Sequence, residues 1–158
     1  MAIIVENGSV VAGANSYITL DEYRTWANAR GFTSQDSDTI LERYVLRAMD
    51  FLERQNFIGN KANENQPLQW PRTEALIDGY YADATEIPPD VKRSLYEATK
   101  SEIDGISELA NLERRTIREK IGDIEVQYDS SSESRTISPA LSLALSKITL
   151  GAYAITRI

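Results

Sequence analysis

The sequence predicts a mainly α protein, a helical bundle of about four helices with one or two small β-hairpins, in a single domain spanning residues 1–158. Three observations support this prediction. Apolar residues recur at three- and four-residue steps in four stretches, which is the period of an α-helix. Two other stretches place β-prone residues around tight-turn signals. The length of 158 residues suits one domain with a sizeable core.

The N-terminal segment, residues 1–16, is predicted to form a small hairpin or an extended arm. Short β-prone runs lie on both sides of Asn7-Gly8, and Asn-Gly is a strong signal for a two-residue hairpin turn. A helix should begin at Thr19, because Thr19 and Glu22 have the spacing of a capping box. Gly31 stands where a left-handed residue would end that helix.

The strongest helical pattern begins at Asp38. Ser37 or Asp38 can cap the helix start, and residues 56–59 offer a stop. The pattern therefore predicts a central helix with one apolar face, formed by Ile40, Leu41, Tyr44, Val45, Ala48, Phe51 and Leu52.

A proline-containing loop follows the central helix. Pro67 and Pro71 bracket Leu68 and Trp70, and two fixed φ angles so close together exclude a regular helix or a central strand. We expect the apolar side chains to lie over the central helix, with Arg72 free to reach carbonyls or acids. Trp70, Pro71 and Arg72 are candidates for a structural clamp that closes the core; the alternative is a site that binds a partner.

A third helix is predicted to begin at Pro88-Pro89, because proline is tolerated in the first helical turn. Its apolar stripe runs to about Leu109, and Gly105 should weaken it late in its course by roughly 1 kcal/mol relative to alanine. The preceding segment, residues 74–87, gives only a weak signal. Nothing in its pattern places Tyr80 and Tyr81.

Residues 116–128 are predicted to form a β-hairpin around Gly122-Asp123. The register set by a two-residue loop places Ile121 opposite Ile124 and Lys120 opposite Glu125. One face is then apolar and must rest on the helices or on another chain, since a lone hairpin is marginal in water. The candidate interface residues of this hairpin are Ile117, Ile121, Ile124, Val126 and Tyr128.

The last helix is predicted over residues 138–158, beginning at Ser138-Pro139. It carries apolar residues on two sides, which implies burial on two sides. The second side could fill the core of a monomer or be covered by a neighbouring subunit. The candidate interface residues on this helix are Leu143, Leu150 and Ile155.

The composition excludes several kinds of chemistry. The chain has no cysteine and no histidine, so disulfides, thiolate catalysis and imidazole ligands are absent. A formal charge of −7 without a basic run disfavours tight binding of nucleic-acid phosphates. No basic segment leads into an apolar one at the start of the chain, and no long apolar run follows. We therefore expect no signal peptide and no membrane span.

The sequence also offers no catalytic constellation. It has no glycine-rich phosphate loop and no nucleophile beside a base. Acidic pairs such as Asp21/Glu22 and Asp123/Glu125 stand at a helix start and a turn, where acids commonly act as caps or solvated groups. We expect no enzyme activity, no catalytic residues, no metal site and no cofactor.

Six segments together resemble a family of tailed-bacteriophage head–tail connector proteins, often labelled as having a DnaT-like single-stranded-DNA-binding domain. Gln-Trp-Pro-Arg at residues 69–72, after a helix, is the most specific of the six. Their order and spacing carry the resemblance more than any one segment does. They are Val5 to Gly8, Ala14 to Glu22, Phe57 to Lys61, Gln66 to Arg72, Ile87 to Lys92 and Glu119 to Val126.

The resemblance implies a structural virion protein located in the neck. It would bind the portal protein and tail or neck proteins and form a homo-oligomeric ring of twelve copies beneath the portal. DNA would pass through the lumen only as cargo, and an acidic lumen would repel its phosphates. The alternative is a replication accessory protein that binds single-stranded DNA. A small enzyme is a third, weaker interpretation.

Overall fold

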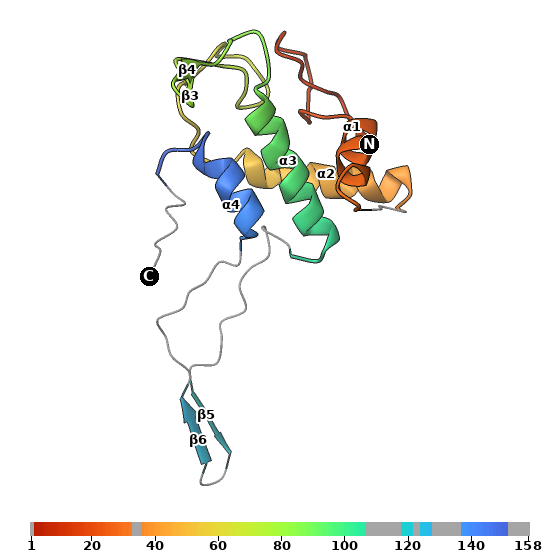
Figure 1. The fold of residues 1–158 in the computed structure, drawn as a ribbon, viewed down its shortest axis with the longest axis vertical. Helices are drawn as coiled ribbons and strands as arrows, with labels where there is room; N and C mark the ends of the chain where they lie inside the picture. Colours follow the sequence, from red (N-terminus) through yellow and green to blue (C-terminus); the bar gives the residue numbers. More distant parts are fainter. Residues whose placement is uncertain (1, 33–35, 107–117, 122–123, 128–136, 152–158) are drawn as a thin grey trace.

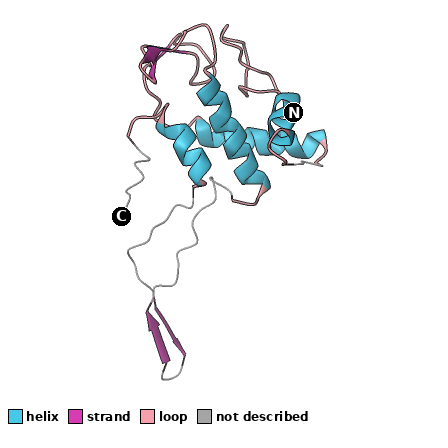
Figure 2. Cartoon of the chain, viewed as in Figure 1, coloured by secondary structure: helices cyan, strands magenta, loops and turns pink. Residues whose placement is uncertain are grey.

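The computed structural model describes residues 2–32, 36–106, 118–121, 124–127 and 137–151 (Figure 1). Within these ranges the fold is mixed and leans towards α, with four helices and short two-stranded antiparallel sheets (Figure 2). The helices are α1 (Leu20–Asn28), α2 (Asp38–Leu52), α3 (Pro89–Ile103) and α4 (Pro139–Ser146). The strands are β1 (Asn60–Lys61), β2 (Arg72–Thr73), β3 (Leu76–Ile77), β4 (Tyr80–Tyr81), β5 (Arg118–Ile121) and β6 (Ile124–Gln127).

Helix α3 holds the helices together, because it packs against α2, α4 and, over a shorter length, α1 (Figure 1). The apolar face predicted for the central helix supplies much of the core, and Leu41, Val45, Ala48 and Leu52 are fully buried. Val91 and Leu95 from α3 and Leu141 and Leu145 from α4 complete it. No helix in the described ranges is long and apolar enough to cross a membrane.

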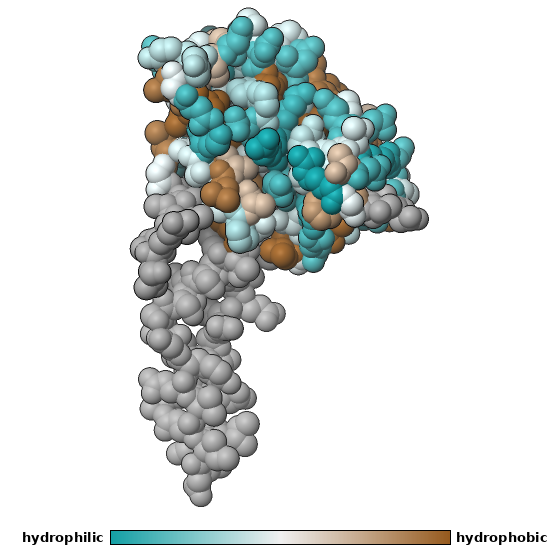
Figure 3. All heavy atoms as spheres, in the orientation of Figure 1, coloured by the Kyte–Doolittle hydropathy of each residue, from teal (hydrophilic) through white to brown (hydrophobic). Residues whose placement is uncertain are grey.

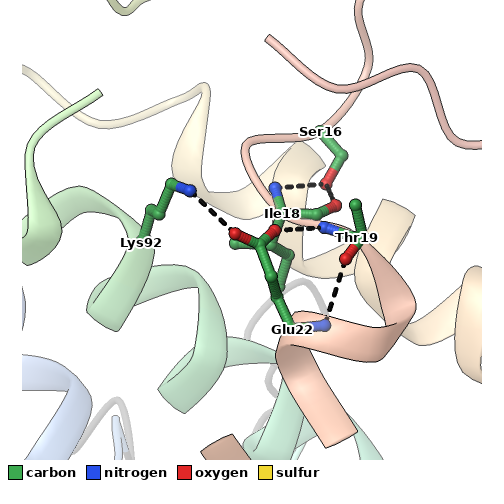
Figure 4. A network of polar contacts seen from close by, with 5 residues as sticks. All are labelled: Ser16, Ile18, Thr19, Glu22 and Lys92. Atoms are coloured by element: carbon green, nitrogen blue, oxygen red, sulfur yellow. Dashed lines mark hydrogen bonds and ion pairs between the residues drawn. The ribbon is translucent and has the colours of Figure 1, made fainter. Parts of the chain in front are cut away.

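Helix α1 begins where the capping box predicts. The Thr19 side chain accepts a hydrogen bond from the Glu22 N–H, and the Glu22 carboxylate accepts one from the Thr19 N–H at 2.7 Å (Figure 4). Lys92 of α3 donates to the other carboxylate oxygen of Glu22 at 2.9 Å. Partial burial would raise the pKa of Glu22, but these hydrogen bonds outweigh burial and hold the pKa below its usual value.

The N-terminal segment forms a closed loop, neither the hairpin nor the extended arm that the sequence predicts. Val5 pairs with Ser16 in an isolated parallel bridge. The buried Glu6 carboxylate accepts hydrogen bonds from the N–H groups of Gly8, Val10 and Val11, which curls the chain around it. The expected Asn-Gly turn is displaced by this carboxylate-centred loop, because a buried carboxylate needs several donors.

Helix α3 ends at Ile103, six residues before the predicted end near Leu109. Gly105 does not lie inside the helix. It adopts φ +78°, and the N–H groups of Gly105 and Ile106 bond back to the Glu102 and Ser101 carbonyls. This is a glycine helix stop of the kind that satisfies terminal carbonyls.

The last helix is also shorter than predicted, because α4 ends at Ser146 instead of continuing through residues 147–151. Thr149 forms an antiparallel bridge with Phe57, and the Leu150 N–H donates to the Asn56 carbonyl at 2.7 Å. Backbone pairing with the turn after α2 therefore replaces the last helical turns. Residues 152–158 lie outside the described ranges.

The hairpin predicted over residues 116–128 is present in its described part. Strands β5 and β6 pair in the predicted register, with Ile121 opposite Ile124 and Lys120 opposite Glu125. Figure 1 draws this ribbon apart from the helices. Two candidate interface residues of this hairpin, Ile117 and Tyr128, lie outside the described residues.

Candidate protein-interaction surface

The loop predicted to act as a clamp is built into the interior. Trp70 is fully buried, and its ring packs edge to face with the Phe57 ring at a centroid distance of 5.9 Å. Pro71 is buried beside it. Strand β2 continues the loop by pairing with β1. Gln66 is buried as well, and its side-chain amide donates to the Leu68 and Pro71 carbonyls.

Arg72 ties this loop to the turn that follows α2. Its guanidinium donates to the carbonyl oxygens of Ile58 at 2.8 Å and Gly59 at 2.6 Å, and to the Gln69 side chain at 3.0 Å. Burial lowers the pKa of Arg72, while the neighbouring Tyr17 and Glu53 oppose this shift. The predicted contact of Arg72 with carbonyls is present, and it leaves only 9 % of the residue exposed.

Buried Tyr17 and half-buried Glu53 hold the same loop through hydrogen bonds. The Tyr17 hydroxyl donates to Glu53 at 2.5 Å and accepts from the Trp70 N–H at 3.2 Å, and the Gln69 N–H donates to the second Glu53 oxygen. Burial raises the pKa of both Tyr17 and Glu53. Because these polar groups are all directed inward, the geometry favours the structural clamp over a partner site here.

The next segment of the chain has the opposite character. Strands β3 and β4 are joined by Asp78 and Gly79, whose φ angles of +50° and +88° are those of a tight hairpin turn. Ala75 and Ile77 anchor the hairpin in the core, whereas Tyr80 and Tyr81 are 80 % and 74 % exposed. The hairpin therefore presents two tyrosines to solvent on a fixed backbone.

One ion pair links the end of α4 to this hairpin. Lys147, directly after α4, donates to Asp78 in the hairpin turn at 2.6 Å and lies 3.8 Å from Asp90 of α3. Leu143 and Leu150, on either side of Lys147, are 59 % and 63 % exposed. Figure 3 shows hydrophobic side chains on the side of the molecule where β3–β4 and α4 lie.

The five most exposed large apolar side chains of the described ranges belong to the β3–β4 hairpin, to α4 and to the segment that follows α4. We call them the apolar tip. Exposed large apolar residues on neighbouring segments are candidates for protein association. The apolar tip consists of Leu76, Tyr80, Tyr81, Leu143 and Leu150.

The predicted interface residues are only partly brought together. Leu143 and Leu150 lie in the apolar tip, whereas Ile121, Ile124 and Val126 lie in the separate β5–β6 ribbon. Ile155 is outside the described residues, as are Ile117 and Tyr128. Sequence reasoning missed Leu76, Tyr80 and Tyr81. The signal that could have placed them is Asp78-Gly79, a strong hairpin dipeptide.

A second aromatic group lies where α1 meets α3. The rings of Trp26 and Tyr96 stack at 5.2 Å, and the Arg30 guanidinium lies 4.6 Å from the Trp26 ring. Lys100 lies 4.4 Å from the ring of Phe32, which itself packs against Trp26. These rings contact one another and two cations, and Trp26 is buried. The described ranges contain no group of three or more acidic side chains placed to hold a metal ion.

The comparisons with known proteins give one match. A family model with the description “Putative DnaT-like ssDNA binding protein” matches residues 1–157. No curated protein and no solved structure matches the chain.

Proposed function

The chain belongs to the family described as putative DnaT-like ssDNA-binding proteins, and within that family we propose that it is a structural virion protein, a head–tail connector. Copies of the chain form a ring under the portal in the neck of the virion, join the capsid to the tail and let DNA pass. This role requires neither a catalytic residue nor a cofactor.

The apolar tip is the observation that carries the proposal. A protein that assembles with others must keep association surfaces exposed until it docks, and large apolar side chains gathered on adjoining elements are typical of such surfaces. By contrast, the polar groups around Trp70 and Arg72 are directed inward and hold the fold. The clamp loop therefore serves the fold, and the exposed apolar side chains are left for a protein contact.

The charge supports passage of DNA rather than capture of DNA. The chain has a formal charge of −7, and carboxylates repel phosphates. Around the apolar tip the acids Glu74, Asp78 and Asp83 flank the tyrosines in sequence, and Lys147 is already bound to Asp78. A DNA strand would meet negative charge at the most exposed aromatic side chains.

The second candidate function is binding of single-stranded DNA, which the description of the family favours. Such binding uses aromatic faces that stack bases in a positively charged groove. Trp26, Tyr96, Arg30 and Lys100 combine both residue types, which the sequence alone does not bring together. However, the rings already stack on each other and on the cations, so a base would have to displace these contacts.

One experiment distinguishes the two candidate functions. The mass of the protein is measured alone and with a portal ring of the same phage, and a labelled oligonucleotide is titrated in the same buffer. Stoichiometric capture by the portal ring without oligonucleotide binding is expected. Tight oligonucleotide binding that weakens steeply with salt, without portal capture, would contradict the connector role and establish the second candidate.

A further inference from the structure

We propose that Asn7 and Gly8 form a site of self-modification, at which the Asn7 side chain loses ammonia and becomes an aspartyl or isoaspartyl residue. The inference goes beyond the connector function and does not depend on it. Asn-Gly predicts a hairpin turn in the sequence, but the chain folds a different loop around this dipeptide. That loop brings together the nucleophile, the proton acceptor and the hydrogen-bond donors that the reaction needs.

The reaction takes place within the chain. The Gly8 nitrogen attacks the side-chain carbonyl carbon of Asn7, gives up its proton and displaces the amide group as ammonia, which closes a succinimide ring. Glycine favours this step because it has no side chain to crowd the nitrogen. Water then opens the ring, at the side-chain carbonyl to leave an aspartyl residue or at the backbone carbonyl to leave an isoaspartyl residue. One water is consumed and one ammonia is released, so the step needs no oxidant, metal or cofactor.

The Glu6 carboxylate is placed to accept the proton that the nucleophile loses. Its Oε1 accepts a hydrogen bond from the Gly8 N–H, the attacking nitrogen, at 2.8 Å. Glu6 is only 1 % exposed, and the N–H groups of Val10 and Val11 hold its two oxygens in place. A carboxylate within hydrogen-bond reach of the proton to be removed has the geometry of a general base.

The Asn7 carbonyl is polarised by its own hydrogen bonds. Its Oδ1 accepts from the Ser9 N–H at 3.1 Å and from the Ser9 hydroxyl at 2.7 Å. The attack places negative charge on this oxygen, and two donors directed at it stabilise that charge as an oxyanion hole does. The bond from the Ser9 N–H is an Asx turn, which folds the Asn7 side chain back over the peptide bond to Gly8. Asn7 is exposed, so ammonia can leave and water can enter.

Packing holds these groups in position. A Cβ atom at position 8 would lie 2.0 Å from the Thr85 carbonyl oxygen, so the loop lies tightly against the segment that precedes α3. Val10 adopts φ +60°, an unfavourable value for a β-branched residue, while its N–H is bound by Glu6 at 3.0 Å. A fixed geometry of nucleophile and electrophile raises the rate of a reaction within one chain.

The test follows the modification of Asn7 by peptide mass spectrometry while the full chain is incubated at neutral pH. One sample is folded, and the other is held unfolded in guanidinium chloride. The variant Asn7→Asp supplies the aspartyl standard, from which the isoaspartyl form is separated by chromatography. Modification should be at least about tenfold faster in the folded protein, because a positioned base and a fixed geometry each contribute a factor of that size or more.

Two variants test the roles of the neighbouring side chains. Glu6→Gln keeps the size of the side chain and removes the base, so it should slow the reaction of the folded protein at least about tenfold. Its rate in guanidinium chloride should equal that of the wild-type protein. Ser9→Ala removes the hydroxyl donor and keeps the backbone donor, so it should slow the folded reaction by a smaller factor. Circular dichroism shows whether each variant is folded.

Asn63 is the matched internal control. Its Oδ1 accepts the Asn65 N–H at 2.9 Å in a similar Asx turn, but the next residue is Glu64 instead of glycine. Asn63 should stay unmodified in the folded protein over the period in which Asn7 is converted. Equal conversion of both residues would mean that an Asx turn alone is sufficient, and the roles given to Glu6 and Gly8 would be wrong.

The comparison of folded and unfolded wild-type protein decides the inference even if Glu6→Gln does not fold. If Asn7 is modified no faster in the folded protein than in guanidinium chloride, the loop does not promote the reaction, and the inference is overturned. It is overturned as well if a folded Glu6→Gln variant reacts as fast as the wild-type protein. None of these results bears on the connector function.

Discussion

Two neighbouring segments, the clamp loop at residues 66–72 and the hairpin at residues 75–82, use aromatic side chains in opposite ways. Trp70 is fully buried and its backbone N–H is bonded to Tyr17, whereas Tyr80 and Tyr81 project into solvent. Both segments are rich in apolar residues in the sequence. The difference shows that burial in the core, and not the presence of an aromatic side chain, decides which aromatic residues are available for binding.

The largest expected effect belongs to the clamp. Trp70→Ala should lower the free energy of unfolding by about 3–5 kcal/mol, because it leaves a cavity beside Phe57 in a fully packed region. Urea denaturation monitored by far-UV circular dichroism measures this change. A loss below about 1 kcal/mol would mean that the loop is not part of the core.

Tyr17→Phe should cost about 2 kcal/mol in the same assay. The substitution keeps the ring but removes the hydroxyl that donates to Glu53 and accepts from the Trp70 N–H, so a half-buried carboxylate and a buried N–H lose a partner. Tyr81→Phe, at an exposed position, is the control, and it should leave the free energy of unfolding nearly unchanged. If Tyr17→Phe and Tyr81→Phe lowered the free energy of unfolding equally, the contrast between a structural clamp and an exposed hairpin would be wrong.

The two bonded glutamates should give opposite pH dependences. Burial raises the pKa of Glu53 above its ordinary value of 4.5, so its contribution to stability is complete below pH 4.5 and is lost as pH rises through the folded value. The pKa of Glu22 is lowered, so its contribution is present above pH 4.5 and is lost as pH falls through the folded value.

Denaturation at pH 3.5 and pH 7 therefore tests both groups. The cost of Glu53→Gln should fall as pH rises, and the cost of Glu22→Gln should rise. At Glu22 the change should stay below about 1 kcal/mol, because the side chain is partly exposed and solvent screens its ion pair with Lys92. The same pH trend for both substitutions would contradict the environments assigned to them.

The smallest effect on stability is expected in the apolar tip. Tyr80→Ser combined with Tyr81→Ser should change the free energy of unfolding by less than about 0.5 kcal/mol, since surface substitutions away from buried networks rarely do more. Denaturation in urea under the conditions used for Trp70→Ala gives a direct comparison. A loss of 2 kcal/mol or more would show that the tyrosines support the fold.

The features that were predicted correctly depend only on residues that are close together in the sequence. The capping box of Thr19 and Glu22 and the β5–β6 register follow from spacing alone. The end of α4 depends instead on the pairing of Thr149 with Phe57, which is far away in the chain. The helical pattern of the sequence therefore predicted a helix that is too long. In α3 the misjudgement was local, because Gly105 fits both a helix interior and a helix stop.

The candidate site was predictable only in part. Apolar residues on two sides of the last helix pointed to Leu143 and Leu150, which are exposed. The exposure of Tyr80 and Tyr81 depends on which residues of the β3–β4 hairpin face the core. Strands of two residues are too short to show an alternation of apolar and polar residues in the sequence. Tertiary contacts decide that question.

The most direct test of the proposed connector role is the mass of the complex formed with a portal ring from the same source, measured by light scattering. The proposal predicts a discrete complex that gains twelve chains of 17.7 kDa each, with no binding of a single-stranded oligonucleotide in the same buffer. A portal ring whose mass does not change, together with salt-sensitive oligonucleotide binding by the free protein, would contradict it.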